Sequence, residues 1–588
     1  MKSRFYSFAL LALLACTTST PTASVTPANT LAAPLPSSEP SLITAQAMVV
    51  SAHPEASRIG LEVLQKGGNA YDAAVAVQFA LAVAFPTAGN LGGGGFFLYR
   101  GYEGSVGALD FREMAPAAAS RDMYLDKQGN VITDLSTAGH LASGVPGTVA
   151  GMVTVHQKLG KLPWTDLVQP AVELARRGVV LTAKEAAGLN RTRPDFIKYN
   201  PKNLPAYVRP DGDTRPWQAG DTIRYPDLAR TLERIRDQGR AGFYQGPTAK
   251  LIVAEMQRGG GIITEQDLLK YQPKWRTPLR GSYRGYDLIA MPPPSSGGVA
   301  LLQMLQMLEP YDLRAAGWHS PLAVHYITEA ERRVYADRAT YLGDPDFGKV
   351  PIAQLTDPTY VKNRMSTLEN NGRATPSSEV QAGAGLPVYE SDQTTHYSIV
   401  DATGNAVSCT TTLNGSYGSK VVVGGAGFLL NNEMDDFSVK AGVPNYYGLV
   451  GGTANAIEPG KRMLSSMTPT IVTQGDKLFM VVGTPGGSTI ITSVLQTIIH
   501  VLDYGMTMQQ AVSAPRLHHQ WLPDQIDAEE NALLPAARDT LQRRGYKINP
   551  RSAWGGSMLS VCSPTATYKA APTHGATIKR WVTRTNLR

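Results

Sequence analysis

Thr394 stands directly before a short alternating segment, THYSIV, and follows a polar, turn-rich stretch. A threonine hydroxyl is a poor nucleophile unless a base lies beside it, and a threonine at a chain terminus can use its own α-amine as that base. An unperturbed α-amine has a pKa of about 7.7 to 8.0, which suits base catalysis near neutral pH. Residue 394 of 588 is not a terminus. The motif therefore predicts a nucleophile together with cleavage of the bond between Gln393 and Thr394.

The same hydroxyl can carry out both steps. Before cleavage it can attack the Gln393 carbonyl and shift the acyl group to oxygen, and hydrolysis of that ester then releases the amine. His396 lies two residues further on and would share the strand face of Thr394. A threonine–histidine pair is therefore the weaker alternative for activating the nucleophile.

Two glycines are the best candidates for an oxyanion hole. Residues 477–484 predict a strand, and residues 489–502 predict an apolar helix. Pro485-Gly486-Gly487-Ser488 connects the two. A strand, a glycine pair and a helix start direct backbone N–H groups outward at the positive end of the helix. Gly486 and Gly487 are therefore predicted to stabilise the anionic intermediate.

The elements that must position these residues differ along the chain. A length of 588 residues exceeds one simple core and favours two large, closely packed parts. Residues up to about 370 indicate a helix-rich α/β body, and polar residues 377–389 indicate an exposed connector leading to Gln393. Beyond Thr394, alternating segments predict two hairpins, at 394–412 and 468–484. Asn90-Leu-Gly-Gly-Gly-Gly-Phe96 predicts close backbone approach, but it lacks the lysine and spacing of a nucleotide loop.

The N-terminus predicts export. Lys2 and Arg4 precede an apolar run, residues 8–15, that is too short to span a bilayer, so residues 1–15 are interpreted as a signal peptide. Leu13-Leu14-Ala15-Cys16 resembles a bacterial lipobox, which implies lipidation of Cys16 and a periplasmic, membrane-anchored protein. The stretch 16–44, rich in Ser, Thr and Pro, would be a flexible tether. A plain signal peptide with an incidental Cys16 is the alternative.

The charge and the cysteines restrict the other function classes. The net charge is +7, but six basic residues lie beyond residue 550 and two lie before residue 5, which leaves −1 for the body. A nearly neutral body gives no reason to expect a nucleic-acid partner. Cys409 and Cys562 allow at most one disulfide, and neither they nor His518-His519 have metal-ligand spacing. We therefore expect neither a cofactor nor a metal.

Longer motifs carry a resemblance to a known family. The small part contains TTHYSIVD, LLNNEMDDF, KRMLSSMTPT and GTPGGS, and the large part contains GGNAYDAAVA, NLGGGGF, LDFREMAP and PPPSSGG. In this order, over roughly residues 45–555, they resemble the γ-glutamyltranspeptidase family of N-terminal-nucleophile hydrolases. The resemblance implies a four-layer αββα sandwich and autocatalytic cleavage into a large subunit, 45–393, and a small subunit, 394–588, that stay together. It also implies transfer of a γ-glutamyl group from glutathione or glutamine to water or to an amine.

The resemblance assigns roles by position. Thr394 would be the nucleophile, Thr412 would orient its amine and hydroxyl, and Gly486 and Gly487 would be the oxyanion donors, in agreement with the reasoning above. The substrate's glutamyl end carries an α-carboxylate and an α-ammonium. Arg112, Ser465 and Ser466 match residues that hold the carboxylate, for which a guanidinium fork is well shaped. Asn414, Glu433 and Asp436 match residues that hold the ammonium, and Tyr447 resembles the tyrosine of a loop that covers the substrate.

The sequence departs from the family's pattern in two places, and two rival functions remain open. Glu433 stands where some bacterial members carry glutamine, which should add one negative charge to the pocket. The basic segment after Tyr568 lacks the family's usual ending, so we expect altered packing of the final strand. An acylase of the same fold that cleaves glutaryl or cephalosporin-type side chains is one rival, although its substrates would leave the ammonium-binding acids unpaired. An uncleaved, non-catalytic binding protein is the other.

Overall fold

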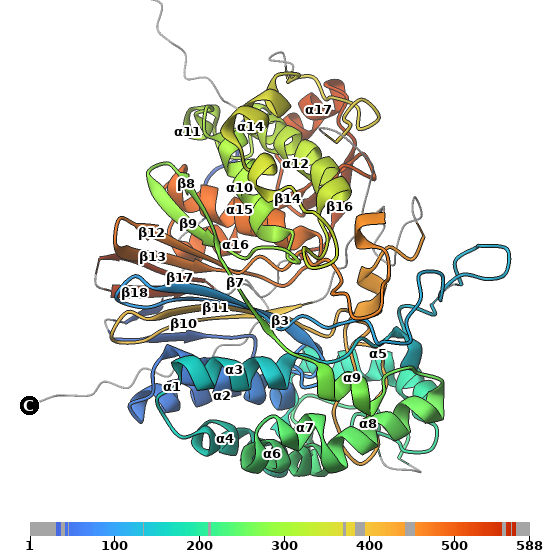
Figure 1. Ribbon diagram of the computed structural model, residues 1–588. Helices are drawn as coiled ribbons and strands as arrows, with labels where there is room; N and C mark the ends of the chain where they lie inside the picture. Colours follow the sequence, from blue (N-terminus) through green and yellow to red (C-terminus); the bar gives the residue numbers. More distant parts are fainter. Residues whose placement is uncertain are drawn as a thin grey trace, which may run out of the picture.

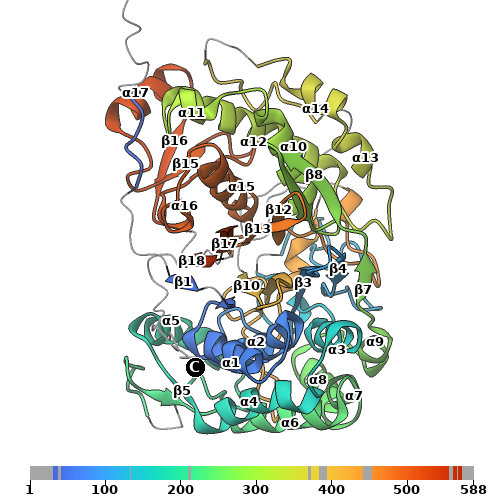
Figure 2. The same ribbon diagram turned by 90° about the vertical axis from the view of Figure 1, so that its left-hand side faces the viewer.

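The protein folds around two β-sheets packed face to face, with helices on both outer sides (Figure 1). The computed structural model describes residues 31–36, 42–44, 46–132, 134–209, 213–368, 372–382, 394–440, 453–554, 560–565 and 567–571. Seen from the side, the layers run helix, sheet, sheet, helix (Figure 2). This arrangement confirms the expected four-layer α/β sandwich.

The first sheet has six strands in the order β2-β10-β11-β3-β4-β7. Its strands are β2 (Met48–Val50), β3 (Gly94–Arg100), β4 (Val106–Asp110), β7 (Lys274–Arg276), β10 (Thr395–Val400) and β11 (Ala406–Thr412). The hairpin β10–β11 is the one predicted after Thr394. It is inserted between β2 and β3, so residues on both sides of the expected cleavage bond form one sheet.

The second sheet has seven strands in the order β1-β18-β17-β13-β12-β9-β8. Its strands are β1 (Leu42–Thr44), β8 (Leu279–Tyr283), β9 (Tyr286–Ala290), β12 (Thr470–Gln474), β13 (Lys477–Val482), β17 (Ser560–Thr565) and β18 (Thr567–Ala571). The predicted hairpin at 468–484 is β12–β13. Two small sheets combine β14 (Leu517–His518), β15 (Ile526–Glu529) and β16 (Ile548–Arg551), and β5 (Val179–Val180) with β6 (Thr222–Ile223).

Helices divide between the two outer layers. Beside the six-stranded sheet lie α1 (Pro54–Gln65), α2 (Ala70–Ala84), α3 (Thr148–Leu159), α4 (Trp164–Arg177), α5 (Ala183–Tyr199), α6 (Pro226–Gln238), α7 (Ala241–Tyr244), α8 (Gly246–Gly259) and α9 (Glu265–Lys270). Beside the other lie α10 (Gly297–Leu308), α11 (Leu313–Ala316), α12 (Pro321–Tyr341), α13 (Ile352–Leu355), α14 (Pro358–Met365), α15 (Thr489–Leu502), α16 (Met508–Ser513) and α17 (Pro535–Arg543). Short 3-10 helices cover His140–Ala142, Glu433–Asp436 and Thr453–Asn455.

Strand β3 contributes side chains to two hydrophobic cores. Phe97 and Tyr99 pack with the helices α1 to α4, whereas Phe96 and Leu98 pack with α10, α15 and the opposite sheet. Successive side chains of a strand point to opposite faces, so a strand buried on both sides is apolar at every position. The wholly buried helix α2 fills the first of these cores, as its apolar sequence predicts.

The glycine-rich loop before β3 and the first residues of β3 pack against backbone. A side-chain carbon on Gly93 would lie 2.0 Å from the carbonyl oxygen of Thr412, and one on Gly95 would lie 2.3 Å from that of Thr410. Asn90 donates to the same Thr412 carbonyl at 2.8 Å. The loop therefore holds the end of β11, next to the predicted nucleophile.

Both ends of the chain differ from expectation. The predicted tether, 16–44, is attached to the body at its end, because the Ala33 N–H donates to the Trp318 carbonyl and Gln510 donates to the Pro36 carbonyl. Residues 42–44 pair with β18. The chain beyond residue 559 also supplies the hairpin β17–β18, so the final strands are present despite the atypical sequence.

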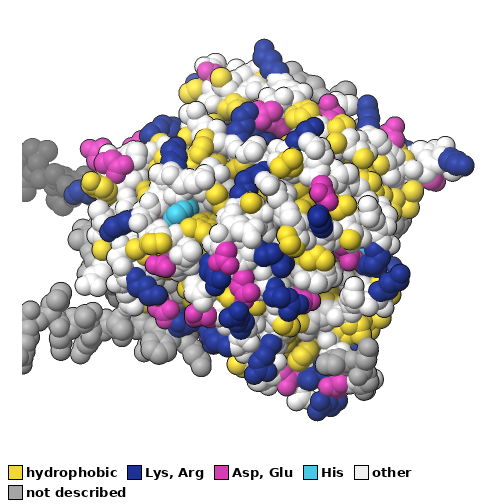
Figure 3. Space-filling view, turned by 60° about the horizontal axis from the view of Figure 1, so that its bottom comes forward, with side chains coloured by type: hydrophobic (Ala, Val, Ile, Leu, Met, Phe, Trp, Pro, Cys, Tyr) yellow, Lys and Arg dark blue, Asp and Glu magenta, His cyan; other side chains and the backbone are white. Residues whose placement is uncertain are grey.

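No helix in the described part of the chain is long and apolar enough to cross a membrane. On the face shown in Figure 3, basic side chains are scattered among acidic and apolar ones.

Candidate active site

Thr394 and Thr412 lie at the same end of the β10–β11 hairpin. The register pairs Thr395 with Thr411 and His396 with Thr410, so the next position along places Thr394 opposite Thr412. Side chains opposite each other on an antiparallel pair share a face, with Cβ atoms about 4.5 to 5.5 Å apart. The hairpin thus brings together the predicted nucleophile and the threonine predicted to orient it.

His396 occupies the same face but has other partners. Its Nδ1 lies 2.9 Å from Thr410 Oγ1 and its Nε2 lies 3.0 Å from Ser398 Oγ. Burial lowers the pKa of His396 to about 3, so the ring is neutral at physiological pH. With both ring nitrogens engaged, the alternative threonine–histidine pair is not formed.

A single pocket gathers most of the predicted site residues. Thr394 opens into it and is 8% exposed. The lining comes from the loop after β4, the β10–β11 hairpin, the 3-10 helix Glu433–Asp436, the segment before β12 and the start of α15. Its members are Arg112, Thr394, Thr412, Asn414, Glu433, Asp436, Ser465, Ser466, Met467 and Ile490.

Arg112 is the cationic centre of this pocket. Its Nη1 is paired with Glu433 and its Nη2 with Asp436, and all three side chains are buried. The guanidinium also donates to the carbonyl oxygens of Met463, at 3.3 Å, and Leu464, at 3.1 Å. Burial acts to lower the pKa of Arg112, but the charges of Glu433 and Asp436 outweigh it and raise that pKa. Arg112 is therefore a fixed positive charge.

Hydrogen bonds fix Ser465 and Asn414 in the pocket wall, whereas the Ser466 hydroxyl makes none to the described residues. The Ser465 N–H donates to Pro294 at 2.9 Å, and its Oγ accepts from the Met467 N–H at 3.2 Å. Ser466 Oγ is buried and has no hydrogen-bond partner among the described residues. Asn414 has a φ of 71°, a left-handed conformation that asparagine tolerates. Its N–H donates to Thr412 Oγ1 at 2.8 Å and its Nδ2 to the Asn432 carbonyl at 2.9 Å.

Gly486 and Gly487 precede α15, as predicted, but they are not among the residues that line the pocket. Their φ values are 137° and 59°, in the region that favours glycine. Both carbonyl oxygens accept from the first turn, from Thr489 at 3.2 Å and Ile490 at 3.0 Å. The loop is therefore hydrogen-bonded to the helical turn that contributes Ile490 to the pocket.

Three predicted residues lie outside the described residues: Gln393, Tyr447 and Cys16. Sequence reasoning missed three others that lie in or beside the pocket. Met467 and Ile490 line it, and Glu113 contacts Arg112 Nη1 at 3.5 Å. Glu113 could have been found, because it directly follows Arg112 in the motif LDFREMAP.

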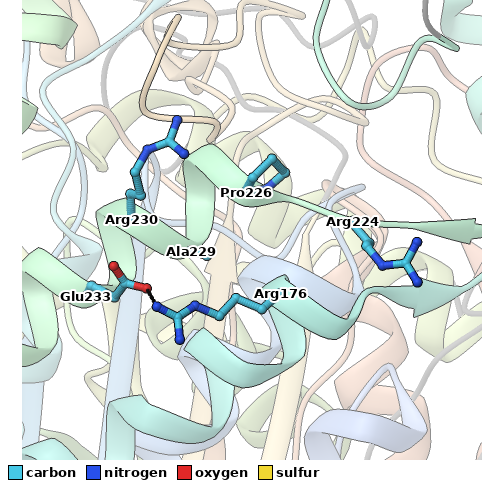
Figure 4. Close-up of a pocket in the computed structure, with 6 residues that line it drawn as sticks. All are labelled: Arg176, Arg224, Pro226, Ala229, Arg230 and Glu233. Atoms are coloured by element: carbon cyan, nitrogen blue, oxygen red, sulfur yellow. Dashed lines mark hydrogen bonds and ion pairs between the residues drawn. The ribbon is translucent and has the colours of Figure 1, made fainter.

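A second hollow lies between α4 and α6 and contains none of the predicted residues (Figure 4). It is lined by Arg176, Arg224, Pro226, Ala229, Arg230 and Glu233. Arg176 is paired with Glu233 and Arg230 with Asp227, so two of its three guanidinium groups are already compensated. Within the described residues no group of three His, Cys, Asp or Glu is arranged to hold a metal ion.

Comparison with known proteins gives consistent matches. A family model described as Gamma-glutamyltranspeptidase matches residues 56–574. The glutathione hydrolase proenzyme of Escherichia coli (strain K12) is 49% identical over 519 residues, which are 88% of each chain. That of Pseudomonas sp. (strain A14) is 50% identical over 501 residues, 85% of this chain and 86% of the relative. The Acylase ACY 1 proenzyme of Pseudomonas sp. (strain SE83) is 36% identical over 532 residues, 89% and 91% of the two chains.

Solved structures agree on the fold. A cephalosporin acylase from Bacillus halodurans superposes with a TM-score of 0.80 at 25% identity, over 92% of this chain and 96% of that one. A γ-glutamyltranspeptidase from Helicobacter pylori gives 0.56 at 45% identity, over 60% of this chain and 97% of that one. The glutathione hydrolase proenzymes are closer in sequence than the acylase. On the family match, these relatives and the four-layer fold, the chain belongs to the γ-glutamyltranspeptidase family of N-terminal-nucleophile hydrolases.

Proposed function

We propose that this γ-glutamyltranspeptidase acts through Thr394 in the pocket shared with Arg112 and Glu433. The observation that carries the proposal is that one pocket contains a threonine after the expected cleavage bond and groups of both charges. A γ-glutamyl group ends in an α-carboxylate and an α-ammonium, so its recognition requires both signs. The substrates are γ-glutamyl donors such as glutathione and glutamine, and the acceptors are water and the amines of amino acids or peptides.

Self-cleavage comes first. Thr394 Oγ attacks the carbonyl carbon of Gln393, the C–N bond breaks as the acyl group moves to oxygen, and the nitrogen takes up the proton. Water then hydrolyses the ester. The products are a carboxylate on Gln393 and a free α-amine on Thr394, so the large and small subunits arise from one precursor.

Turnover uses the new amine as base. The amine takes the proton of Thr394 Oγ as the oxygen attacks the γ-carbonyl of the donor, and the leaving amine departs with a proton. A γ-glutamyl ester on Thr394 remains and is resolved by water or by an acceptor amine. We assign the N–H groups of Gly486 and Gly487 to the negative charge of the tetrahedral intermediates. Thr412, opposite Thr394 in register, orients the amine and hydroxyl.

The donor's glutamyl end lies across the charged pocket. Arg112, with Ser465 and Ser466, receives the α-carboxylate, and the unpartnered hydroxyl of Ser466 supports this assignment. Asn414, Glu433 and Asp436 receive the α-ammonium. Tyr447 is assigned to a loop over the substrate on its resemblance alone.

Export and anchoring complete the proposal. Residues 1–15 direct the chain out of the cytoplasm, and Cys16 carries a lipid that holds the enzyme on the periplasmic side of a membrane. The sequence Leu13-Leu14-Ala15-Cys16 supports this assignment. Replacing Cys16 by Ser should release the enzyme from the membrane fraction.

An acylase activity is the second candidate, and it is favoured by the similarity to a cephalosporin acylase structure. The two are separated by comparing γ-glutamyl-p-nitroanilide with glutaryl-p-nitroanilide, which lacks the α-ammonium. We expect turnover of the first, accelerated by a dipeptide acceptor, and two bands on a denaturing gel with a new N-terminus at Thr394. An intact chain after prolonged incubation would instead support a non-catalytic binding protein.

A further inference from the structure

Glu113 places a second carboxyl group against the guanidinium that Glu433 already neutralises. It follows Arg112 in the loop after β4, is fully buried, and approaches Arg112 Nη1 at 3.5 Å through Oε2. Neither of its carboxyl oxygens has a hydrogen-bond partner among the described residues. A side-chain carbon on Gly94 would lie 2.7 Å from Oε2, so strand β3 closes that side of the carboxyl group.

Glu433 also has one carboxyl oxygen without a hydrogen-bond partner among the described residues. Its Oε1 accepts from Arg112 Nη1, whereas its buried Oε2 has no partner in the described part of the chain. Because Nη1 contacts both Glu433 and Glu113, the two carboxyl groups lie side by side. With Asp436 on Nη2, three buried carboxyl groups face one guanidinium.

Three ionised carboxylates around one cation would leave two uncompensated charges in a buried site. Burying a charge without a counter-charge costs several kcal/mol, and the usual outcome is that one group takes up a proton. A proton also converts an acceptor-only carboxylate into a donor. A carboxylic acid beside a carboxylate forms a strong O–H···O hydrogen bond, which would satisfy one orphan oxygen of each glutamate.

We infer that Glu113 and Glu433 share one proton at neutral pH, so that the pair carries a single negative charge beside Arg112. Burial raises the pKa of Glu113 to about 7 and raises the pKa of Glu433 well above its ordinary value, which agrees with this geometry. Two carboxyl groups coupled in this way titrate as a pair.

The other titratable groups around the two glutamates do not change the net charge of this cluster. Asp436 faces the pair from the same 3-10 helix and is bound to Arg112. From α9's C-terminal end, Tyr271 donates its hydroxyl to the Arg112 carbonyl at 2.8 Å, and Tyr244 stacks on Tyr271. Burial raises the pKa of both phenols, so they are uncharged. Arg112, Asp436 and the protonated pair then sum to one negative charge.

This net charge changes the effect expected of Glu433 in the pocket. The replacement of glutamine by glutamate was expected to add a negative charge, but a shared proton makes the glutamate equivalent in charge to the amide it replaces. This consequence for the substrate rests on the proposed function, whereas the shared proton does not. Glu113 is thus a positioning residue that acts through Glu433.

The test is infrared spectroscopy of the full-length protein in H2O and D2O, from about pH 5 to about pH 9. We expect a carbonyl band of a buried, protonated carboxylic acid that disappears at high pH. The band should be lost in Glu113→Gln and also in Glu433→Gln, because either amide can donate to the remaining carboxylate. A band that survives in both variants, or that only one substitution removes, would overturn the shared proton.

A matched control distinguishes this pair from another buried acid. Burial also raises the pKa of Glu331, which accepts the His519 N–H at 2.9 Å. Glu331→Gln should remove its own band and leave that of the pair. In the Glu331→Gln background the band of the pair is isolated, and its titration remains decisive if a Glu113 or Glu433 variant fails to fold. The infrared test does not require turnover. If the protein lacked γ-glutamyl activity, the proposed function would be refuted, but the infrared band of the pair would still be present.

Discussion

Arg112 donates through Nη1 to Glu433, a residue 321 positions later in the chain. The pairing joins segments from the two sides of the proposed cleavage bond inside the candidate pocket. It also means that the cation assigned to the substrate's α-carboxylate is held by acids assigned to its α-ammonium. Binding a γ-glutamyl group therefore exchanges internal partners for the two charged ends of the ligand, which leaves the net charge of the site unchanged.

The first prediction is that Arg112→Lys raises the KM for γ-glutamyl-p-nitroanilide by roughly 10- to 100-fold. A lysine ammonium keeps the charge but cannot form the forked pair with a carboxylate, and a hydrogen bond to a charged group contributes about 1.5 to 3 kcal/mol. Initial-rate kinetics measure this effect. Arg112→Ala is a poorer probe, because it leaves buried Glu433 and Asp436 without a counter-ion. An unchanged KM in the lysine variant would remove Arg112 from the binding site.

A second prediction contrasts the adjacent serines. Ser466→Ala should raise the donor KM by roughly tenfold, equivalent to about 1.4 kcal/mol, and leave the thermal midpoint close to that of the wild type. Its hydroxyl makes no hydrogen bond in the described structure, so folding loses little. Ser465→Ala should lower the midpoint as well, because Ser465 Oγ accepts from the Met467 N–H. Kinetics and thermal unfolding on both variants provide the comparison, and equal effects on stability would contradict it.

A third prediction concerns the nucleophile. Thr394→Ala should remain a single chain on a denaturing gel and lose activity by roughly a thousandfold or more. Thr395→Val is the matched control, because it removes the next buried hydroxyl, which has no partner among the described residues. That variant should still be cleaved. Normal cleavage of Thr394→Ala would show that another group attacks the bond.

Local patterns predicted the hairpin and the helix that frame the site. Alternation and a turn at 402–405 place Thr394 and Thr412 at one end of β10–β11, and the helix after Gly487 covers Thr489–Leu502 as expected. These features depend on neighbours within about 20 residues, where periodicity and turn chemistry act directly.

Other features depend on contacts that local patterns do not encode. The placement of Arg112 and Glu433 in one pocket was predicted only through resemblance to a family, and their direct pairing was not predicted. The role of Glu113 emerges only once three carboxyl groups meet. The strand status of Gly94–Arg100 was also missed, because glycines weaken a strand pattern and here permit close approach to β11. The ordered end of the tether depends in the same way on a distant partner, Trp318.

The last prediction concerns acid stability. His396 is held neutral between Thr410 and Ser398, with its pKa lowered by burial to about 3. An unfolded histidine has a pKa of about 6.5, so between these two values the unfolded chain binds more protons than the folded one. Folding stability therefore falls as pH decreases through this interval, by up to about 1.4 kcal/mol per pH unit for one such group. Thermal midpoints of wild type and His396→Gln, measured from about pH 7 down to about pH 4.5, should converge as the pH decreases. Parallel curves would show that the pKa of His396 is the same in the folded and the unfolded protein.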